Sequence, residues 1–200
     1  MKIKATFVIT ILALMIFSMT LSVKAQENYY GQTKVELYNG FYFLIPDSYI
    51  ATTDLYPIIE GKEQITKTYK NNKTAANIQF TAFKLPDNDK TLKEMGIEKY
   101  ITDKMNKILN IKSAKTIDMN GRDTFFLRGE TKQNYIMESY HYGSNSTRST
   151  STSTVKLEVV MYIIKEGEYV YVSCYQTPTH YFATHLRTFL EIQNSFTNGK

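Results

Sequence analysis

In the segment from Val155 to Gln176, side chains of one kind recur at every second position, and this pattern constrains the fold more than any other feature. Successive side chains of a β-strand point to opposite faces of the sheet, so a period of two predicts strands. One predicted strand covers residues 155–164, and a turn at Lys165-Glu166-Gly167 leads into a second over residues 168–176. The first places a row of aliphatic residues on one face: Val155, Leu157, Val159, Met161 and Ile163.

Three further hairpins are predicted upstream. Asn39-Gly40 and Asn120-Gly121 each separate two runs rich in β-branched and aromatic residues, and Asn-Gly is a preferred sequence for a two-residue hairpin turn. The predicted strand pairs cover residues 34–44, then 64–69 with 75–84, then 113–118 with 123–130, the last continued by 135–142. The chain is therefore built mainly from antiparallel strands.

Two segments have the period of amphipathic helices. Thr91 and Glu94 have the spacing of a capping box, in which each side chain satisfies a backbone N–H of the first turn. The second helix is predicted to start at Thr177-Pro178, since proline is tolerated in a first turn. The predicted buried stripes are Ile97, Ile101, Met105 and Ile108 in the first helix, and Phe182, Leu186, Phe189, Leu190 and Phe196 in the second. Each stripe is expected to pack on a sheet.

Residues 1–25 resemble a signal peptide. Lys2 and Lys4 precede an apolar stretch, and the small residue Ala25 stands at the expected cleavage point. An uncleaved N-terminal anchor is the alternative, because the apolar stretch could extend towards Leu21. Cleavage near Ala25 would place the protein in the periplasm or outside the cell, with no membrane span left. Residues 26–33 are then a flexible leader and residues 34–198 a single α+β domain.

Within this domain, residues 144–154 consist almost entirely of serine and threonine. Such a segment buries little apolar surface, which predicts a mobile loop between two strands.

Charge and cysteine content exclude several protein classes. Without Lys2, Lys4 and Lys24, the 24 basic residues fall to 21, against 19 acidic residues. No block of like charge remains, so the basic surface of a nucleic-acid-binding protein is missing. The single cysteine, Cys174, cannot close an intramolecular disulfide, so stability must come from a core rich in the 16 tyrosines and 11 phenylalanines.

Residues that could carry chemistry are few. His180 and His185 are five positions apart on a predicted helix and so do not share a face, and His141 stands alone. Cys174 shares one face of its strand with Val170 and Val172, which predicts a buried thiol rather than a nucleophile. We therefore predict no catalytic residue, no metal site and no cofactor. A secreted hydrolase using a Ser/His or Cys/His pair is the alternative.

The late strands also carry a tyrosine-bearing face, which is a candidate interaction surface because interfaces favour aromatic side chains with a polar end. The alternative is that a helix covers this face and the tyrosine hydroxyls reach solvent at its margin. The candidate residues are Tyr169, Tyr171, Tyr175, Tyr140, Tyr142 and Arg128.

Residues 41–49, with the sequence FYFLIPDSY, resemble the opening strand of the Mog1/PsbP-like superfamily, which includes DcrB-type periplasmic proteins. The terminal Ser195-Phe196 is also similar, whereas Tyr49 stands where such proteins often have tryptophan. The resemblance implies an α+β fold, with an antiparallel β-sheet flanked by helices in an α/β/α sandwich. Members of the superfamily share no catalytic residues.

The expected function is therefore that of an exported, non-enzymatic binding or accessory protein of the bacterial envelope. Its partner would be a protein or a small envelope ligand. A structural envelope component is a further alternative to the hydrolase.

Overall fold

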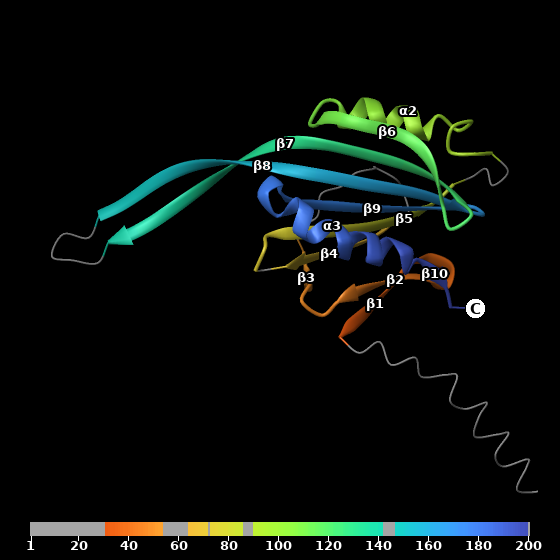
Figure 1. Cartoon of the computed structure of the whole chain (residues 1–200), viewed down its shortest axis with the longest axis horizontal. Coiled ribbons are helices and arrows are strands. Elements are labelled where there is room, and N and C mark those ends of the chain that lie inside the picture. The colour runs from red at the N-terminus through yellow and green to blue at the C-terminus, as the bar shows by residue number, and fades with distance from the viewer. Residues whose placement is uncertain (1–30, 54–63, 72, 86–89, 142–146, 200) are drawn as a thin grey trace, which may run out of the picture. The chain divides into compact units, whose positions relative to one another are not determined.

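A computed structural model describes residues 31–53, 64–71, 73–85, 90–141 and 147–199, and residues Gln32–Lys200 form one compact unit (Figure 1). The side chains of residues 135–149 are outside this description. The predicted signal peptide and most of the predicted leader lie outside the described residues. Gln32 and Thr33, assigned to the leader, instead belong to the first strand.

The larger sheet has seven strands in the order β3-β4-β5-β9-β8-β7-β6, and every pair of neighbours is antiparallel. The hairpins predicted within it are confirmed, with longer strands than the sequence indicated. Their bounds are β3 Ile50–Thr52, β4 Gln64–Asn71, β5 Ala76–Lys84, β6 Asn110–Met119, β7 Arg122–His141, β8 Thr147–Glu166 and β9 Tyr169–Pro178.

A second, three-stranded sheet joins the two ends of the compact unit. β1 (Gln32–Glu36) and β2 (Phe41–Pro46) form the first predicted hairpin. Its turn, in the 3-10 segment η2 (Tyr38–Gly40), places Asn39 and Gly40 at φ values of 56° and 75°, which glycine and asparagine tolerate best. The short β10 (Thr197–Asn198), which the sequence did not predict, pairs with the other edge of β2.

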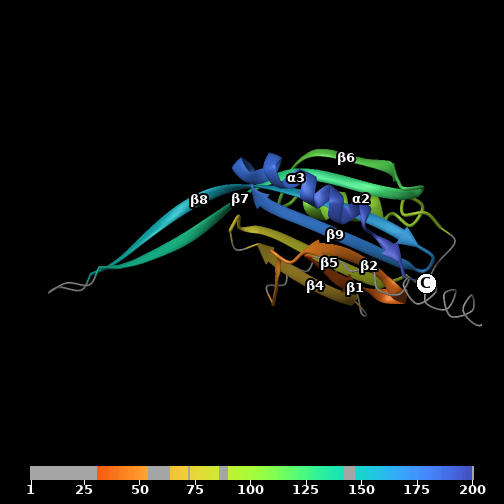
Figure 2. The same cartoon turned by 60° about the horizontal axis from the view of Figure 1, so that its bottom comes forward.

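The seven-stranded sheet buries both of its faces. On one face, Val160, Tyr162 and Ile164 of β8 pack with residues of α3 (Thr179–Asn194) and of the three-stranded sheet. On the other face, Val159, Met161 and Ile163 pack with residues of α2 (Ile97–Met105). The α+β class with antiparallel sheets is confirmed. The expected helical flanking is incomplete, because the second sheet shares one face with α3 (Figures 1 and 2).

The first helix is shorter than predicted. The capping box forms, with the Glu94 carboxylate accepting from the Thr91 N–H at 2.8 Å and the Thr91 hydroxyl accepting from the Glu94 N–H at 3.2 Å. It closes only a turn, because Gly96 adopts the left-handed conformation and α2 begins after it. Ile101 and Met105 are buried as predicted, but Ile108 lies beyond the helix and is exposed.

α3 begins at Thr179, two residues later than predicted, and Pro178 is its N-cap residue. Phe182 and Phe189 are buried, as is Phe196 just after the helix. Leu190 is exposed, and Ile192 takes its place in the buried stripe.

The predicted Ser/Thr loop is wrong from Thr147 onward, because residues 147–154 form the first part of β8. They pair residue by residue with β7, from His141 opposite Thr147 to Asn134 opposite Thr154. β9 pairs with β8 only from Leu157, and β6 pairs with β7 only up to Glu130. Residues 131–141 and 147–156 therefore form a two-stranded ribbon, here called the arm, which projects from the sheet (Figures 1 and 2).

Candidate functional site

The predicted tyrosine surface is wrong at its centre. Tyr171 and Tyr175 are 1% and 0% exposed, because α3 and the three-stranded sheet cover the face on which they lie. The Tyr171 hydroxyl donates to the carbonyl oxygen of Tyr38 at 3.0 Å, and Tyr175 stacks on Phe189 with 4.5 Å between ring centroids. Burial raises the pKa of both phenols above the ordinary value. These tyrosines are core residues. A helix covers their face, as the alternative interpretation held, but their hydroxyls lie inside the molecule and do not reach solvent at its margin.

The other predicted surface residues have separate environments. Tyr169 is half-buried and stacks on Tyr38 with 5.3 Å between ring centroids. Tyr140 belongs to the arm, but its side chain is outside the described part of the structure. Tyr142 lies outside the described residues. Among the predicted surface residues, only Arg128 lies near the base of the arm and has a side chain that the structure describes.

Arg128 belongs to a charged network that spans β6, β7 and β8. Its guanidinium donates to the Glu158 carboxylate and lies 4.6 Å from the centroid of the Phe182 ring. Lys112 donates to Glu130 at 2.5 Å and lies 3.7 Å from the carboxylate of Glu158. The hydrogen bond from Lys112 holds the pKa of Glu130 below its ordinary value.

The network satisfies a carboxylate that would otherwise be isolated from water. Glu158 is only 1% exposed and needs cationic partners there. Arg128 is therefore already engaged inside the molecule, through an ion pair and a ring contact. Its role in contacting a partner stays a prediction.

Beside this network, a cavity of about 490 Å³ opens where the arm leaves the sheet. We call its lining the arm root: Ile108, Asn110, Glu130, Thr131, Lys132 and Lys156. Ile108 is 61% exposed, the largest exposed fraction among the large hydrophobic residues described. Lys132 and Lys156 are both exposed and lie directly opposite each other on β7 and β8, and like charges directly opposite disfavour a strand pair. Glu130 in the same lining interacts electrostatically with Lys156, so one carboxylate offsets part of the charge of the two lysines.

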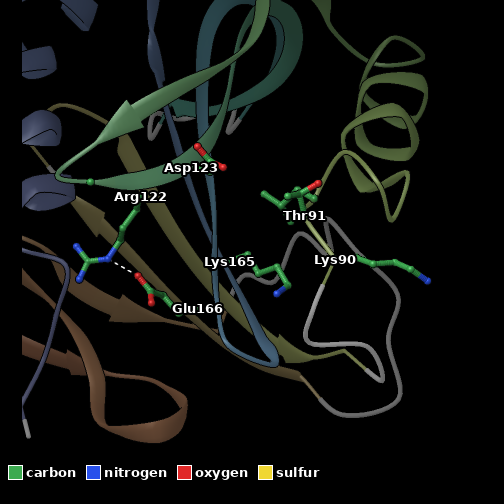
Figure 3. A pocket seen from close by; sticks show the side chains of 8 residues that line it. Lys90, Thr91, Arg122, Asp123, Lys165 and Glu166 are labelled. Carbon is green, nitrogen blue, oxygen red and sulfur yellow. Dashed lines mark hydrogen bonds and ion pairs between the residues drawn. The ribbon is translucent and has the colours of Figure 1, made fainter.

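A smaller cavity of about 290 Å³ lies at the opposite end of β7 and β8, between these strands and the turn that precedes α2. Figure 3 shows Arg122 and Glu166 turned toward each other, with Lys90 pointing away from them. Arg122 also lies 5.4 Å from the ring centroid of Phe196, and the Thr91 hydroxyl is engaged with Glu94. The arginine, the glutamate and the threonine thus already hold together the turns that surround this cavity.

The residues considered for catalysis do not come together in the part of the chain that the structure describes. Cys174 packs against the α2 face of the sheet, and burial raises its pKa to about 12, so the thiolate needed for nucleophilic attack is not formed near neutral pH. His180 is exposed on α3, and both it and His185 contact the ring of Tyr181 rather than a serine or a carboxylate. No group of three metal-ligating side chains gathers among the described residues.

Sequence reasoning missed the arm root. Ile108 was assigned to a buried stripe, and Lys132 and Lys156 carried no motif. The signal that could have found them is the register of the β7/β8 hairpin, which places the two lysines opposite each other only once residues 147–156 are paired as a strand.

Comparison with solved structures identifies the fold. The solution structure of cyanobacterial PsbP (CyanoP) from Synechocystis matches with a TM-score of 0.54 and 13% identity, covering 84% of this chain and 92% of that one. The chain has the Mog1/PsbP-like fold. The resemblance read from residues 41–49 and from Ser195-Phe196 is thereby confirmed at the level of fold.

Two other solved structures match with lower TM-scores. A protein of unknown function from Pseudomonas aeruginosa, described as a putative regulator, has a TM-score of 0.47 and 9% identity over 84% of this chain and 98% of that one. The Ran-binding protein Mog1p of Saccharomyces cerevisiae has a TM-score of 0.44 and 15% identity over 84% of this chain and 95% of its own. No family model and no curated protein sequence matches the chain.

No helix in the described ranges has both the length and the hydrophobicity needed to cross a membrane.

Proposed function

We propose that this chain is an exported, non-enzymatic binding or accessory protein of the bacterial envelope, and that it contacts a protein partner through the arm root. The observation that carries the proposal is the combination, at one place, of an exposed isoleucine, a cavity of about 490 Å³ and two opposed lysines. Interfaces combine an apolar contact with a charged rim in this way.

The chemistry of the arm root defines the partner. Glu130 is paired with Lys112, so Lys132 and Lys156 give the cavity an excess of positive charge. An acidic side chain of a partner would relieve the repulsion between the two lysines, and an adjacent apolar side chain would cover Ile108. We therefore propose a protein partner that presents an acidic residue beside an apolar one.

The extracytoplasmic location rests on the N-terminal sequence, with its basic start, apolar stretch and Ala25. The non-enzymatic role is supported by the half-buried, weakly acidic thiol of Cys174 and by His180 and His185, which contact the ring of Tyr181. The shared fold with cyanobacterial PsbP is compatible with an accessory role but does not identify a partner.

The binding proposal is tested by chemical cross-linking in envelope preparations, followed by mass spectrometry. Ile108→Ser combined with Lys156→Glu should remove the cross-linked partner. The matched control is Ile50→Ser combined with Lys115→Glu, because Ile50 on β3 is 58% exposed and Lys115 is an exposed lysine on β6. If both double variants give the partner set of the unmodified protein, the arm root is not the contact surface.

The remaining parts of the proposal have separate tests. N-terminal sequencing of the protein from a periplasmic or culture fraction should begin near Gln26, and recovery of an intact Met1 would indicate an anchor instead. Replacing His141, His180 and His185 by alanine together should leave the partner set unchanged. Histidine-dependent hydrolysis of simple ester or phosphate substrates would show that the protein is an enzyme.

A further inference from the structure

The arm leaves one long edge of β8 without a neighbour. Residues Thr147 to Lys156 pair with β7 on one side, and the ladder to β9 on the other side starts only at Leu157 opposite Pro178. Along this edge, backbone N–H and C=O groups alternate with no strand partner in the described chain. Such an edge is a template for adding another strand.

The other free edges of the larger sheet carry features that discourage strand addition. One of them is the β7 edge of the arm, which pairs with β6 only up to Glu130 and carries the charged residues Lys132 and Glu138 beyond it. β3 is only three residues long. β6 has a register shift between Ile111 and Ser113 and carries the charged residues Lys112, Lys115 and Asp118. Short strands, bulges and edge charges are the devices by which sheets avoid edge-to-edge pairing.

Between Arg148 and Lys156, the free edge of β8 has none of these devices. Residues 149–155 contain no charged residue and no proline, and their register with β7 is continuous. The described side chains from Thr150 to Thr152 are exposed, so the strand is not masked by a neighbouring element. This difference between the edges points to an edge that is kept available for pairing.

We propose that the β8 edge of the arm pairs with the same edge of a second copy of this chain, antiparallel and related by a two-fold axis at Ser151. A two-fold contact uses the same surface on both copies and closes after two subunits, whereas a head-to-tail contact would continue. The two arms then form one four-stranded ribbon. This inference does not depend on the arm root, because the segment that pairs in the proposed register, residues 147–155, contains none of the arm-root residues.

Charge favours an axis at Ser151 over one at the neighbouring Thr152. Centring the pair on Ser151 sets Thr147 of one copy opposite Val155 of the other, and Arg148 opposite Thr154, so the full uncharged segment is used. Centring it on Thr152 would set Arg148 opposite Lys156 at both ends, and like charges directly opposite are destabilising. In the Ser151 register, serines and threonines of the two copies face each other, and such cross-strand pairs are favourable.

The first test is the oligomeric state of the whole protein, measured by sedimentation velocity over a range of concentrations. One pair of edges is smaller than a standard interface, so we expect a reversible dimer with a dissociation constant in the micromolar range. Ser151→Lys sets two lysines against each other on the axis and should weaken the dimer at least tenfold. Ala114→Lys, which adds the same charge to the exposed edge of β6, should leave it unchanged.

The second test fixes the register. Opposed residues of antiparallel strands have Cα atoms about 4.5 to 5.5 Å apart, a separation that a disulfide spans. In a Cys174→Ala background, Ser151→Cys should cross-link two copies rapidly under mild oxidation, whereas Thr154→Cys should not. Thermal melting of each variant establishes that it is folded.

Three results would overturn the proposal: a monomer at every concentration, equal dimerisation of Ser151→Lys and the unmodified chain, or equal cross-linking at Ser151→Cys and Thr154→Cys. Addition of an extended peptide to this edge of a monomeric protein would show that the edge binds a foreign strand instead of a second copy.

Discussion

Arg128 offers the sharpest test of how this structure uses its charged residues. Its side chain is 38% exposed, whereas that of its partner Glu158 is 1% exposed. Removing one member of a fully buried ion pair costs about 3–5 kcal/mol, because the other charge is left without compensation. Since Arg128 is partly exposed and Lys112 remains 3.7 Å from Glu158, we reduce the expected cost of Arg128→Met to about 2–3 kcal/mol.

The assay is urea denaturation of the purified protein, with thermal melting as a second readout. A loss of this size lowers the melting temperature of a domain of this length by about 5–10 °C. A double-mutant cycle with Arg128→Met and Glu158→Gln isolates the ion pair from the contact with Phe182, and we expect a coupling of about 1–3 kcal/mol.

The matched control is Arg187 and Glu191 on α3, whose side chains are 89% and 61% exposed and whose charged atoms lie 3.0 Å apart. Its coupling should be about 0.3–0.5 kcal/mol, as for other exposed helix pairs. If the Arg128 cycle gives no more than the control cycle, Arg128 does not stabilise Glu158. Its predicted role in an interaction surface would then regain support.

Three further predictions concern the core and the first helix. Burial raises the pKa of Tyr49 to about 12. Because the unfolded chain ionises first, the contribution of Tyr49 to stability should be complete below pH 10 and lost as the pH rises towards 12. An absorbance titration in which every tyrosine of the folded protein ionises near pH 10 would refute this. Cys174, with a pKa raised to about 12, should react with a thiol reagent at least a hundredfold more slowly in the folded protein than in urea, and equal rates would mean that the thiol is accessible. Thr91→Ala removes the capping box and should lower the free energy of unfolding by about 1 kcal/mol, measured by denaturation. The control is Thr184→Ala on the exposed part of α3. An equal effect of the two substitutions would show that the box contributes nothing.

The strand pairs could be predicted because their signals are local. The alternation over residues 155–176 and the Asn-Gly turns at residues 39–40 and 120–121 each lie within one hairpin. β10 could not be predicted, since two residues carry no period and the strand exists only because β2 offers an edge, where Thr197 pairs with Tyr42 far back in the sequence.

The tyrosine face shows where local reasoning ends. Alternation correctly put Tyr171 and Tyr175 on the same face, but their burial depends on α3 and on the second sheet, which come from distant parts of the chain. The prediction of a loop for the Ser/Thr segment was wrong from Thr147 onward for a related reason. Its composition favours a loop, yet threonine also suits a strand, and the paired segment of β7 decides the outcome.

The three-stranded sheet has a consequence for how the protein is made. β1, near the start of the compact unit, becomes part of a complete layer only when β10 has joined β2 and Phe196 has packed against Phe41 and Phe43. These contacts need residues 196–198, so the compact unit cannot finish folding before that segment has been made. For a protein threaded through a membrane as an extended chain, as the proposed export requires, this delay preserves a state that the translocation channel can accept.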